Sequence, residues 1–353
     1  MQDERSLPRF PVALTILPTY TCSAACRDCC FQCSPRVRGR IPQARLLRYI
    51  EEASKVSSIR LVVFSGGECF LLGQDLAEAV GRASSLGMLT RCVSNGFWAR
   101  SARTARARLQ PLVDAGLNEI NFSTGDEHQE WVPIERVAVG TSVALRMGLT
   151  VAIAVERHRE GHFTLEHLVS NPALAEVLSD PELRRRLRLL QSPWITEDTV
   201  GADQMQNQQS GINKNNLIYG GCNSVLSTLV ISPSEYLAAC CGLTHEQIPE
   251  MRLGSLREHS LADLIAEGKS DFLKLWLMIE GPLRILSWAA EKDPTIQWEG
   301  LYRHHCDACR AIYTDHRVRQ AIEKHYSEKI VDVVFRFTVL DRARLGILRR
   351  AIS

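Results

Sequence analysis

The sequence predicts an α/β fold in which the first 200 residues form a parallel sheet with helices, followed by a smaller cysteine-bearing domain. Two observations support this prediction. Apolar runs alternate with amphipathic stretches along residues 12–200, which is the pattern of strand–helix–strand units. About six such units can be counted, whereas a closed barrel of this type has eight. We therefore expect a partial, TIM-like (β/α)6 barrel.

Each predicted strand is a short apolar run, and helical spacing of apolar residues marks the stretches between the strands. Polar motifs come directly after several of the strands, which is where parallel α/β folds place their chemistry. The strands are expected at residues 12–17, 60–64, 88–93, 119–123 and 149–155, with a weaker sixth at 187–190, and the helices at 43–57, 76–86, 102–115, 134–148 and 181–186.

The composition is that of an ordinary soluble globular protein, with 45% hydrophobic and 23% charged residues. No apolar run reaches the ~20 residues that a membrane-spanning helix needs. Residues 1–9 carry both charge signs and lack the apolar core of a signal peptide. We therefore expect a cytoplasmic protein with no membrane partner. The net charge of +2 argues neither for nor against nucleic acid, and no run of aromatic and basic residues supports such a partner.

Twelve cysteines are many for a cytoplasmic chain, and most of them fall into three groups. In a reducing compartment, clustered cysteines favour metal or iron–sulfur ligation over disulfides. Only Cys69 and Cys92 stand apart, and Cys92 is expected in the core. The three groups are Cys22, Cys26, Cys29, Cys30 and Cys33; Cys222, Cys240 and Cys241; and Cys306 and Cys309.

The spacing of Cys22, Cys26 and Cys29, C-x3-C-x2-C, indicates a metal cluster that binds a further ligand. Three thiolates so close together can hold three irons of a cubane cluster and leave the fourth iron open. A structural site instead closes itself with four ligands. The alternative is a structural zinc site with Cys30 or Cys33 as the fourth ligand.

The run Ser65-Gly66-Gly67-Glu68 after the second predicted strand adds to this triplet. Together they resemble the radical S-adenosylmethionine (SAM) superfamily over roughly residues 12–200. The resemblance implies that the three cysteines bind a [4Fe-4S] cluster and that SAM chelates its open iron. It also implies that SAM is cleaved reductively to a 5′-deoxyadenosyl radical, which takes a hydrogen atom from an unactivated C–H bond.

The resemblance further implies which residues contact SAM. Gly66, Gly67 and Glu68 line its amino group, since glycines let a backbone approach a ligand closely and a carboxylate suits an ammonium group. The residue before the third cysteine is usually aromatic and packs near the adenine. Here it is Asp28, so Phe31 is expected to make the adenine contact. Order along the barrel adds positions at the ends of the later strands: Ser94, Asn95, Ser123, Asp126 and Glu156.

The second cysteine region resembles the auxiliary-cluster domains of the same superfamily, called SPASM or Twitch. The resemblance implies one auxiliary [4Fe-4S] cluster, because the region has five cysteines where a full SPASM domain has seven for two clusters. Glu235 stands where the family usually has glycine. A structural zinc knot is the alternative. The implied ligands are Cys222, Cys240, Cys306 and Cys309, with Cys241 an open alternative to Cys240.

The predicted domain order places the barrel before the auxiliary-cluster domain. The barrel is expected at residues 1–200, a polar linker rich in Gln and Asn at 201–221, the auxiliary-cluster domain at 222–320 and a tail at 321–353. The tail contains a basic stretch, for which a solvated helix face is the first interpretation. Binding of an acidic leader peptide is the sharper alternative. The basic residues are Arg342, Arg344, Arg349 and Arg350.

These features predict an enzyme that matures a ribosomally made peptide, because auxiliary clusters of this type often accompany peptide modification in the superfamily. Two outcomes are open: Cα epimerisation, which needs a thiol hydrogen-atom donor, or oxidative cross-linking. The spare cysteines favour epimerisation, with Cys241 as the candidate donor because it adjoins a predicted cluster. The expected partners are the precursor peptide and a reductant such as flavodoxin or ferredoxin. Modification of a nucleotide or cofactor precursor is the alternative enzyme class, and a zinc-stabilised binding protein is the non-enzyme alternative.

Overall fold

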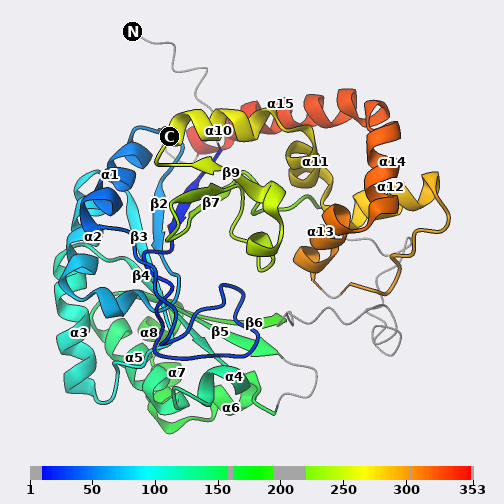
Figure 1. Ribbon diagram of the computed structural model, residues 1–353. Coiled ribbons are helices and arrows are strands. Elements are labelled where there is room, and N and C mark those ends of the chain that lie inside the picture. The colour runs from blue at the N-terminus through cyan, green and yellow to red at the C-terminus, as the bar shows by residue number, and fades with distance from the viewer. Residues whose placement is uncertain (1–9, 158–161, 194–219, 303, 351–353) are drawn as a thin grey trace. The chain divides into compact units, whose positions relative to one another are not determined.

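The chain forms two units, which are drawn together in Figure 1. The computed structural model describes residues 10–157, 162–193, 220–302 and 304–350. The predicted linker lies outside these residues except at Gly220 and Gly221. Its polar, mobile character and the predicted domain bounds therefore stay predictions.

We call the two units the sheet unit and the helical unit. The sheet unit comprises residues 13–197 together with the short segment 231–236. The helical unit comprises residues 1–12, 198–230 and 237–353.

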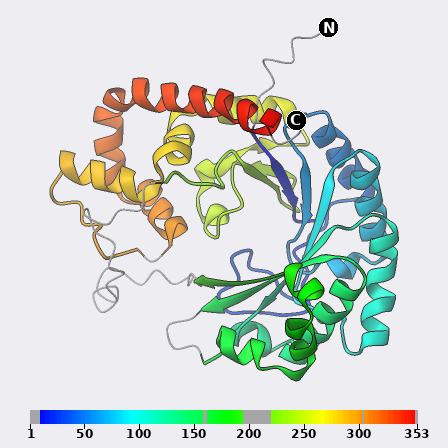
Figure 2. The ribbon, with the colours of Figure 1, turned by 180° about the vertical axis from the view of Figure 1, so that it is seen from behind.

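Six parallel strands form the centre of the sheet unit, in the order β6-β5-β4-β3-β2-β1 (Figure 1, and from behind in Figure 2). Every neighbouring pair is parallel, so the α/β fold with its parallel sheet is confirmed. The sixth strand, whose sequence signal is weak, pairs with β5 from Leu187 to Pro193. The strands are β1 Ala13–Ile16, β2 Leu61–Phe64, β3 Leu89–Ser94, β4 Glu119–Thr124, β5 Thr150–Arg157 and β6 Leu187–Pro193.

Helices connect consecutive strands, and the longer ones present an apolar stripe to the interior. In the first of them, Leu46, Tyr49, Ile50 and Ala53 are buried at helical spacing. All five predicted helices are confirmed to within a few residues, but the short helices Asp126–Gln129, Leu165–Val169 and Pro172–Ser179 were not predicted. The helices are α1 Gln43–Ser54, α2 Gln74–Ser85, α3 Ala102–Asp114, α4 Asp126–Gln129, α5 Ile134–Arg146, α6 Leu165–Val169, α7 Pro172–Ser179 and α8 Pro181–Arg185.

The helical unit packs its helices around the fully buried Trp276. The indole ring meets that of Trp288 edge-on at 4.8 Å, and its Nε1 donates a hydrogen bond to Glu280 at 2.8 Å. Lys329 and Arg336 reach the same carboxylate from the last helix, each at 3.3 Å. The elements that lie wholly or mostly in this unit are β7 Thr228–Ile231, β8 Tyr236–Ala238, β9 Arg252–Ser255, α10 Leu261–Ser270, α11 Phe272–Glu280, α12 Pro282–Lys292, α13 His305–Thr314, α14 His316–His325 and α15 Ser327–Arg350.

The predicted tail is helical through α15. No helix in the described part of the chain combines the length and the apolar character needed to cross a membrane. The side chains beyond residue 340 lie outside the description, so both interpretations of Arg342, Arg344, Arg349 and Arg350 stay open.

Glu235, in the turn between β7 and β8, adopts the backbone conformation of the glycine that the resemblance implies at this position. Its φ is +65°, a left-handed conformation that glycine adopts most easily. Its carboxylate is buried and accepts hydrogen bonds from Arg45 Nη1, at 2.8 Å to each oxygen, and from the Tyr49 hydroxyl at 2.5 Å. Within the sheet unit, these contacts hold the 231–236 segment against α1.

Replacing Glu235 with alanine or with glycine is expected to separate these two effects. Both variants lose the carboxylate, which we expect to cost about 2 kcal/mol because Arg45 is half-exposed and can be rehydrated. Only alanine keeps the left-handed strain, so the alanine variant should be less stable than the glycine variant by about 1 kcal/mol. Urea unfolding of the reduced apoprotein measures both differences. A glycine variant as stable as the wild type would contradict a stabilising role for the ion pair.

Candidate functional site

The cysteine loop after β1 is held against the turn after β2 by backbone hydrogen bonds within the sheet unit. Gly67 N donates to Thr19 O at 2.9 Å, and Glu68 N donates to Thr21 O at 3.0 Å. A Cβ at Gly67 would lie 2.3 Å from Thr21 O, and one at Gly66, where φ is +104°, would lie 2.6 Å from Thr19 O. In this structure, then, the close neighbour that requires both glycines is the cysteine loop itself.

Replacing Gly67 with alanine is therefore expected to displace the cysteine loop and to prevent its cysteines from binding an iron–sulfur cluster. The obstructing Thr21 oxygen belongs to the backbone, so the whole loop must move. Iron per chain after anaerobic reconstitution should fall by about half, the share of one of two cubane clusters. Gly81→Ala in α2 is the matched control, because its nearest neighbour, the Ala115 Cβ, would be 3.8 Å away. Equal iron in the two variants would contradict the prediction.

The thiols of Cys22, Cys26 and Cys29 are half-buried; two of them accept hydrogen bonds from the backbone, and that of Cys26 donates one to Glu127 O at 3.8 Å. Ala24 N donates to Cys22 Sγ and Cys33 N donates to Cys29 Sγ, both at 3.4 Å. A hydrogen bond from the Cys33 thiol lowers the pKa of Cys29 to about 6. Burial raises the pKa of Cys22 to about 11, and burial together with the nearby Cys29 raises that of Cys26.

This donor set fits an iron–sulfur cluster. Soft thiolate ligands suit iron–sulfur clusters, and N–H···S hydrogen bonds are among the groups that set a cluster's potential. The mutual repulsion that raises the pKa of Cys26 is the repulsion that a bound cation removes.

Residues from the ends of β2 and β3 converge on the same loop. The Glu68 carboxylate is fully buried and accepts hydrogen bonds from Phe70 N at 3.0 Å, Ser94 Oγ at 3.0 Å and Asn95 N at 2.9 Å. Burial raises its pKa to about 7. The Asn95 amide in turn donates to Ser23 Oγ at 3.0 Å, inside the cysteine loop. Glu68, Ser94 and Asn95 therefore form one network beside Cys22.

The ends of β4 and β5 add a second network, and part of it was not predicted from the sequence. Glu156 is buried, accepts a hydrogen bond from Glu127 N at 2.6 Å and lies 2.5 Å from His128 Nδ1. The Glu127 carboxylate accepts from Arg27 N at 2.5 Å and lies 2.9 Å from the Arg27 guanidinium. Glu127, which follows β4, thus holds the cysteine loop through Arg27. No local sequence pattern at residue 127 indicates that role.

Three further residues, Asp126, Ser123 and Phe31, were also predicted to contact SAM. The Asp126 carboxylate accepts hydrogen bonds from His162 N and Phe163 N, both at 3.1 Å, so it faces the segment after β5. Ser123, in β4, and Phe31, in the cysteine loop, are half-buried. Asp28 is buried and lies 3.6 Å from Arg27 Nε.

In the helical unit, four cysteines line one enclosed pocket with mostly apolar walls. Cys306 and Cys309 lie one turn apart on α13, while Cys222 precedes β7 and Cys240 follows β8. A Cβ at Gly242 would lie 3.0 Å from Cys306 Sγ and 3.6 Å from Cys240 Sγ, which places these two sulfurs side by side. Burial raises the pKa of Cys306 to about 11 and those of Cys240 and Cys309 as well. Four soft donors in one apolar pocket fit a second cluster.

Cys241 is not among the residues that line this pocket. Its thiol lies 3.3 Å from the Ser224 hydroxyl, and its backbone N donates to the same oxygen at 3.1 Å. Of the two alternatives, the geometry favours Cys240 as the ligand.

The isolated cysteines have structural surroundings. Cys69 and Cys92 are fully buried, and the Cys69 thiol donates to Val93 O at 3.3 Å. Within the described ranges, no three His, Cys, Asp or Glu side chains converge closely enough to share one metal ion. The ligand sets therefore remain proposals.

Comparisons with known proteins were made by sequence and by structure. No family model matches the chain. Over 150 residues it is 23% identical to the "Putative peptide biosynthesis protein YydG" of Bacillus subtilis strain 168, a stretch that covers 42% of this chain and 47% of that protein. The chain resembles the radical SAM enzymes. The cysteine triplet seated against the Gly-Gly-Glu turn on a parallel sheet carries this resemblance, and the chain spans about half the length of its curated relative.

Two solved structures match the chain at low sequence identity. SuiB of Streptococcus suis, bound to S-adenosylmethionine, is 15% identical with a TM-score of 0.42, covering 72% of this chain and 65% of SuiB. The protein anSMEcpe, with bound AdoMet and the Cp18Cys peptide, is 12% identical with a TM-score of 0.49, covering 88% of this chain and 99% of that one.

Proposed function

We propose that the protein is a radical SAM enzyme that modifies a ribosomally made peptide. The observation that carries this proposal is the convergence of the three-cysteine loop with the Gly-Gly-Glu turn and Asn95 in one hydrogen-bonded arrangement. The sequence similarity to a protein named for peptide biosynthesis supports a peptide as the substrate class.

Seven cysteines form two proposed sets of cluster ligands. Cys22, Cys26 and Cys29 would hold a [4Fe-4S] cluster, and Cys222, Cys240, Cys306 and Cys309 would hold one auxiliary [4Fe-4S] cluster. When bound, the first cluster and SAM supply a carbon-centred radical that takes a hydrogen atom from the substrate. The residues proposed to bind SAM are Gly66, Gly67, Glu68, Ser94, Asn95, Ser123, Asp126, Glu156 and Phe31.

These side chains would prepare the site in distinct ways. Glu68 fixes the backbone of Asn95, and Asn95 bonds back to Ser23, so the wall beside Cys22 keeps one shape. Glu127 ties Arg27 down and thereby holds the loop between Cys26 and Cys29. Such preorganisation places reacting groups without a cost at the moment of reaction.

For the reaction type, we propose Cα epimerisation with Cys241 as the hydrogen-atom donor, and oxidative cross-linking as the second candidate. The Ser224 hydroxyl lies 3.3 Å from the Cys241 sulfur and orients the thiol, and Cys241 is not needed as a cluster ligand when Cys240 is one. The electron that reduces the first cluster would come from a low-potential carrier such as flavodoxin or ferredoxin. We propose a cytoplasmic location, where the reducing environment keeps these cysteines from forming disulfides.

The test is anaerobic reconstitution followed by turnover in deuterated water. Reconstituted protein should be brown, carry about eight irons and release 5′-deoxyadenosine from SAM under a reductant. With a candidate precursor peptide, one deuterium at a single Cα indicates epimerisation, and loss of two hydrogens indicates cross-linking. Colourless protein with tightly held zinc would contradict the radical SAM proposal.

A further inference from the structure

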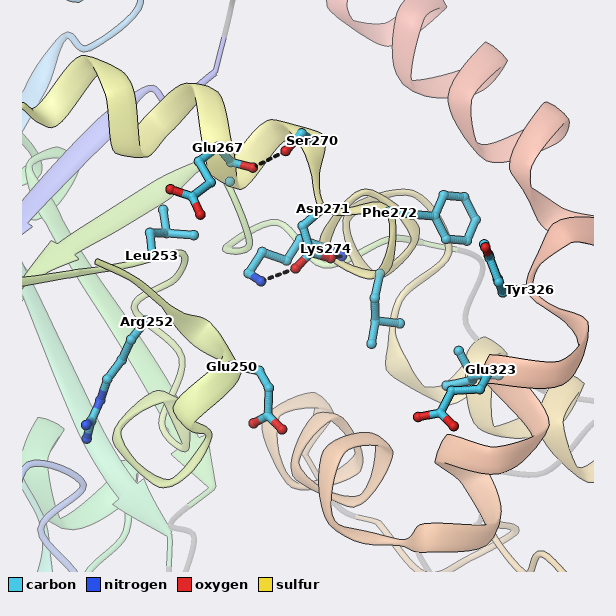
Figure 3. A pocket seen from close by; sticks show the side chains of 13 residues that line it. Glu250, Arg252, Leu253, Glu267, Ser270, Asp271, Phe272, Lys274, Glu323 and Tyr326 are labelled. Atoms are coloured by element: carbon cyan, nitrogen blue, oxygen red, sulfur yellow. Dashed lines mark hydrogen bonds and ion pairs between the residues drawn. The ribbon is translucent and has the colours of Figure 1, made fainter. Parts of the chain in front are cut away.

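A second cavity, of about 680 Å³, lies within the helical unit and contains no cysteine (Figure 3). It lies beside the turn from α10 to α11 and is also lined by the start of β9 and by α14. Its volume is in the range of pockets that bind small ligands.

The inner walls of this cavity are apolar and aromatic. Phe272 and Tyr326 lie side by side (Figure 3), with ring centroids 5.8 Å apart. Ile322 and Leu253 add aliphatic surface. Lys274, the cation in the wall, is only 4% exposed and is ion-paired with Asp271. The interior therefore offers aromatic faces and no uncompensated positive charge.

The rim of the cavity is acidic. Glu250, Glu267 and Glu323 are exposed there, against one exposed cation, Arg252. Within the described residues, the carboxylates of Glu267 and Glu323 form no ion pair or hydrogen bond. Glu250 pairs with the exposed Arg319 at 3.6 Å and Arg252 with the half-buried Glu246 at 3.8 Å, and ion pairs in which one partner is exposed contribute little. The rim thus keeps a negative potential.

We propose that this cavity binds a cationic, amphipathic segment of the peptide substrate. One basic residue of the segment would pair with Glu267 on one side of the cavity and another with Glu323 on the other side (Figure 3). An apolar side chain of the segment would lie on Phe272 and Tyr326, whose ring faces also attract cations. This inference rests on the proposed function for the idea that the substrate is a peptide. It predicts recognition of a basic segment, opposite in charge to the acidic leader considered for the basic tail.

The test uses the full-length reconstituted enzyme and two fluorescent dodecapeptides. One alternates lysine with leucine and phenylalanine, and the other has glutamate at every lysine position. The basic peptide should bind, and the acidic one should not. Glu267→Gln/Glu323→Gln should weaken binding about tenfold, the effect of two exposed charge pairs. Glu267→Lys/Glu323→Lys should reverse the preference.

The matched control is Glu258→Gln/Glu299→Gln, which removes two exposed carboxylates of the helical unit that do not line the cavity. Its affinity for the basic peptide should equal that of the wild type. No binding by the basic peptide, or equal weakening in control and cavity variants, would overturn the proposal.

The same samples distinguish this proposal from the proposed function. SAM cleavage without peptide should be unchanged in every variant, because no altered residue belongs to the cysteine loop or its networks. Normal SAM cleavage with unaltered peptide binding in the cavity variants refutes the cavity and leaves the enzyme proposal intact. Absence of SAM cleavage in the wild type refutes the enzyme proposal, whatever the cavity binds.

Discussion

Replacing Cys29 with alanine is expected to abolish SAM cleavage and to lower the iron content by about half, since only one of two cubane clusters is lost. Cys29 has the lowest pKa of the three loop thiols because Cys33 donates a hydrogen bond to it, so it is the thiol most readily available as a ligand near pH 7. The measurements are iron per chain and the yield of 5′-deoxyadenosine under dithionite.

Cys30→Ala is the control for this experiment, because Cys30 adjoins Cys29 but lies outside the proposed ligand set. It should keep the full iron content and normal SAM cleavage. If the two variants exchange their results, the third ligand is Cys30. If both variants leave SAM cleavage intact, the radical SAM proposal fails.

Cys240→Ala and Cys241→Ala are expected to differ in their effects on iron content and on deuterium incorporation. Cys240→Ala should lose about half of the iron, because a ligand is removed from the four-thiol pocket, while SAM cleavage without peptide continues. Cys241→Ala should keep its iron and SAM cleavage but incorporate deuterium into the peptide only at background level, because the hydrogen-atom donor is gone.

Iron analysis and peptide mass spectrometry in deuterated water read these two effects independently. Iron loss in the Cys241 variant with full iron in the Cys240 variant would assign the ligand role to Cys241. Full deuterium incorporation by the Cys241 variant would exclude that thiol as the donor.

The fold could be predicted largely from local pattern. Apolar runs of four to eight residues followed by helical stripes identify the strands of a parallel α/β sheet, and even the weak run at 187–190 proved to be a strand. The helices α6 and α7 were not predicted from the sequence, although α8, with only five residues, was. A capping residue begins each of them, Thr164 and Asn171, and that is the signal that identifies short helices.

The candidate site could be predicted only where its residues share a short motif. Contacts between residues far apart in the sequence have no local sequence pattern that predicts them. Glu127 binds Arg27 across 100 positions of sequence, and Arg45 binds Glu235 across 190. These pairs form because the carboxyl ends of parallel strands meet at one edge of the sheet and because a distant segment packs on α1.

The sequence by itself determined the chemistry on offer: three closely spaced thiols, a Gly-Gly-Glu turn one strand later, and a second set of cysteines. Spacing along the chain limits which thiols can share a cluster, so that inference needs no coordinates. Only the tertiary structure decided which neighbour each group meets. It turned Glu68 toward Ser94 and Asn95, and it placed Cys240 rather than Cys241 in the four-thiol pocket. Neighbouring residues in an extended chain point to opposite sides, and which side faces the pocket is set by packing rather than by residue type.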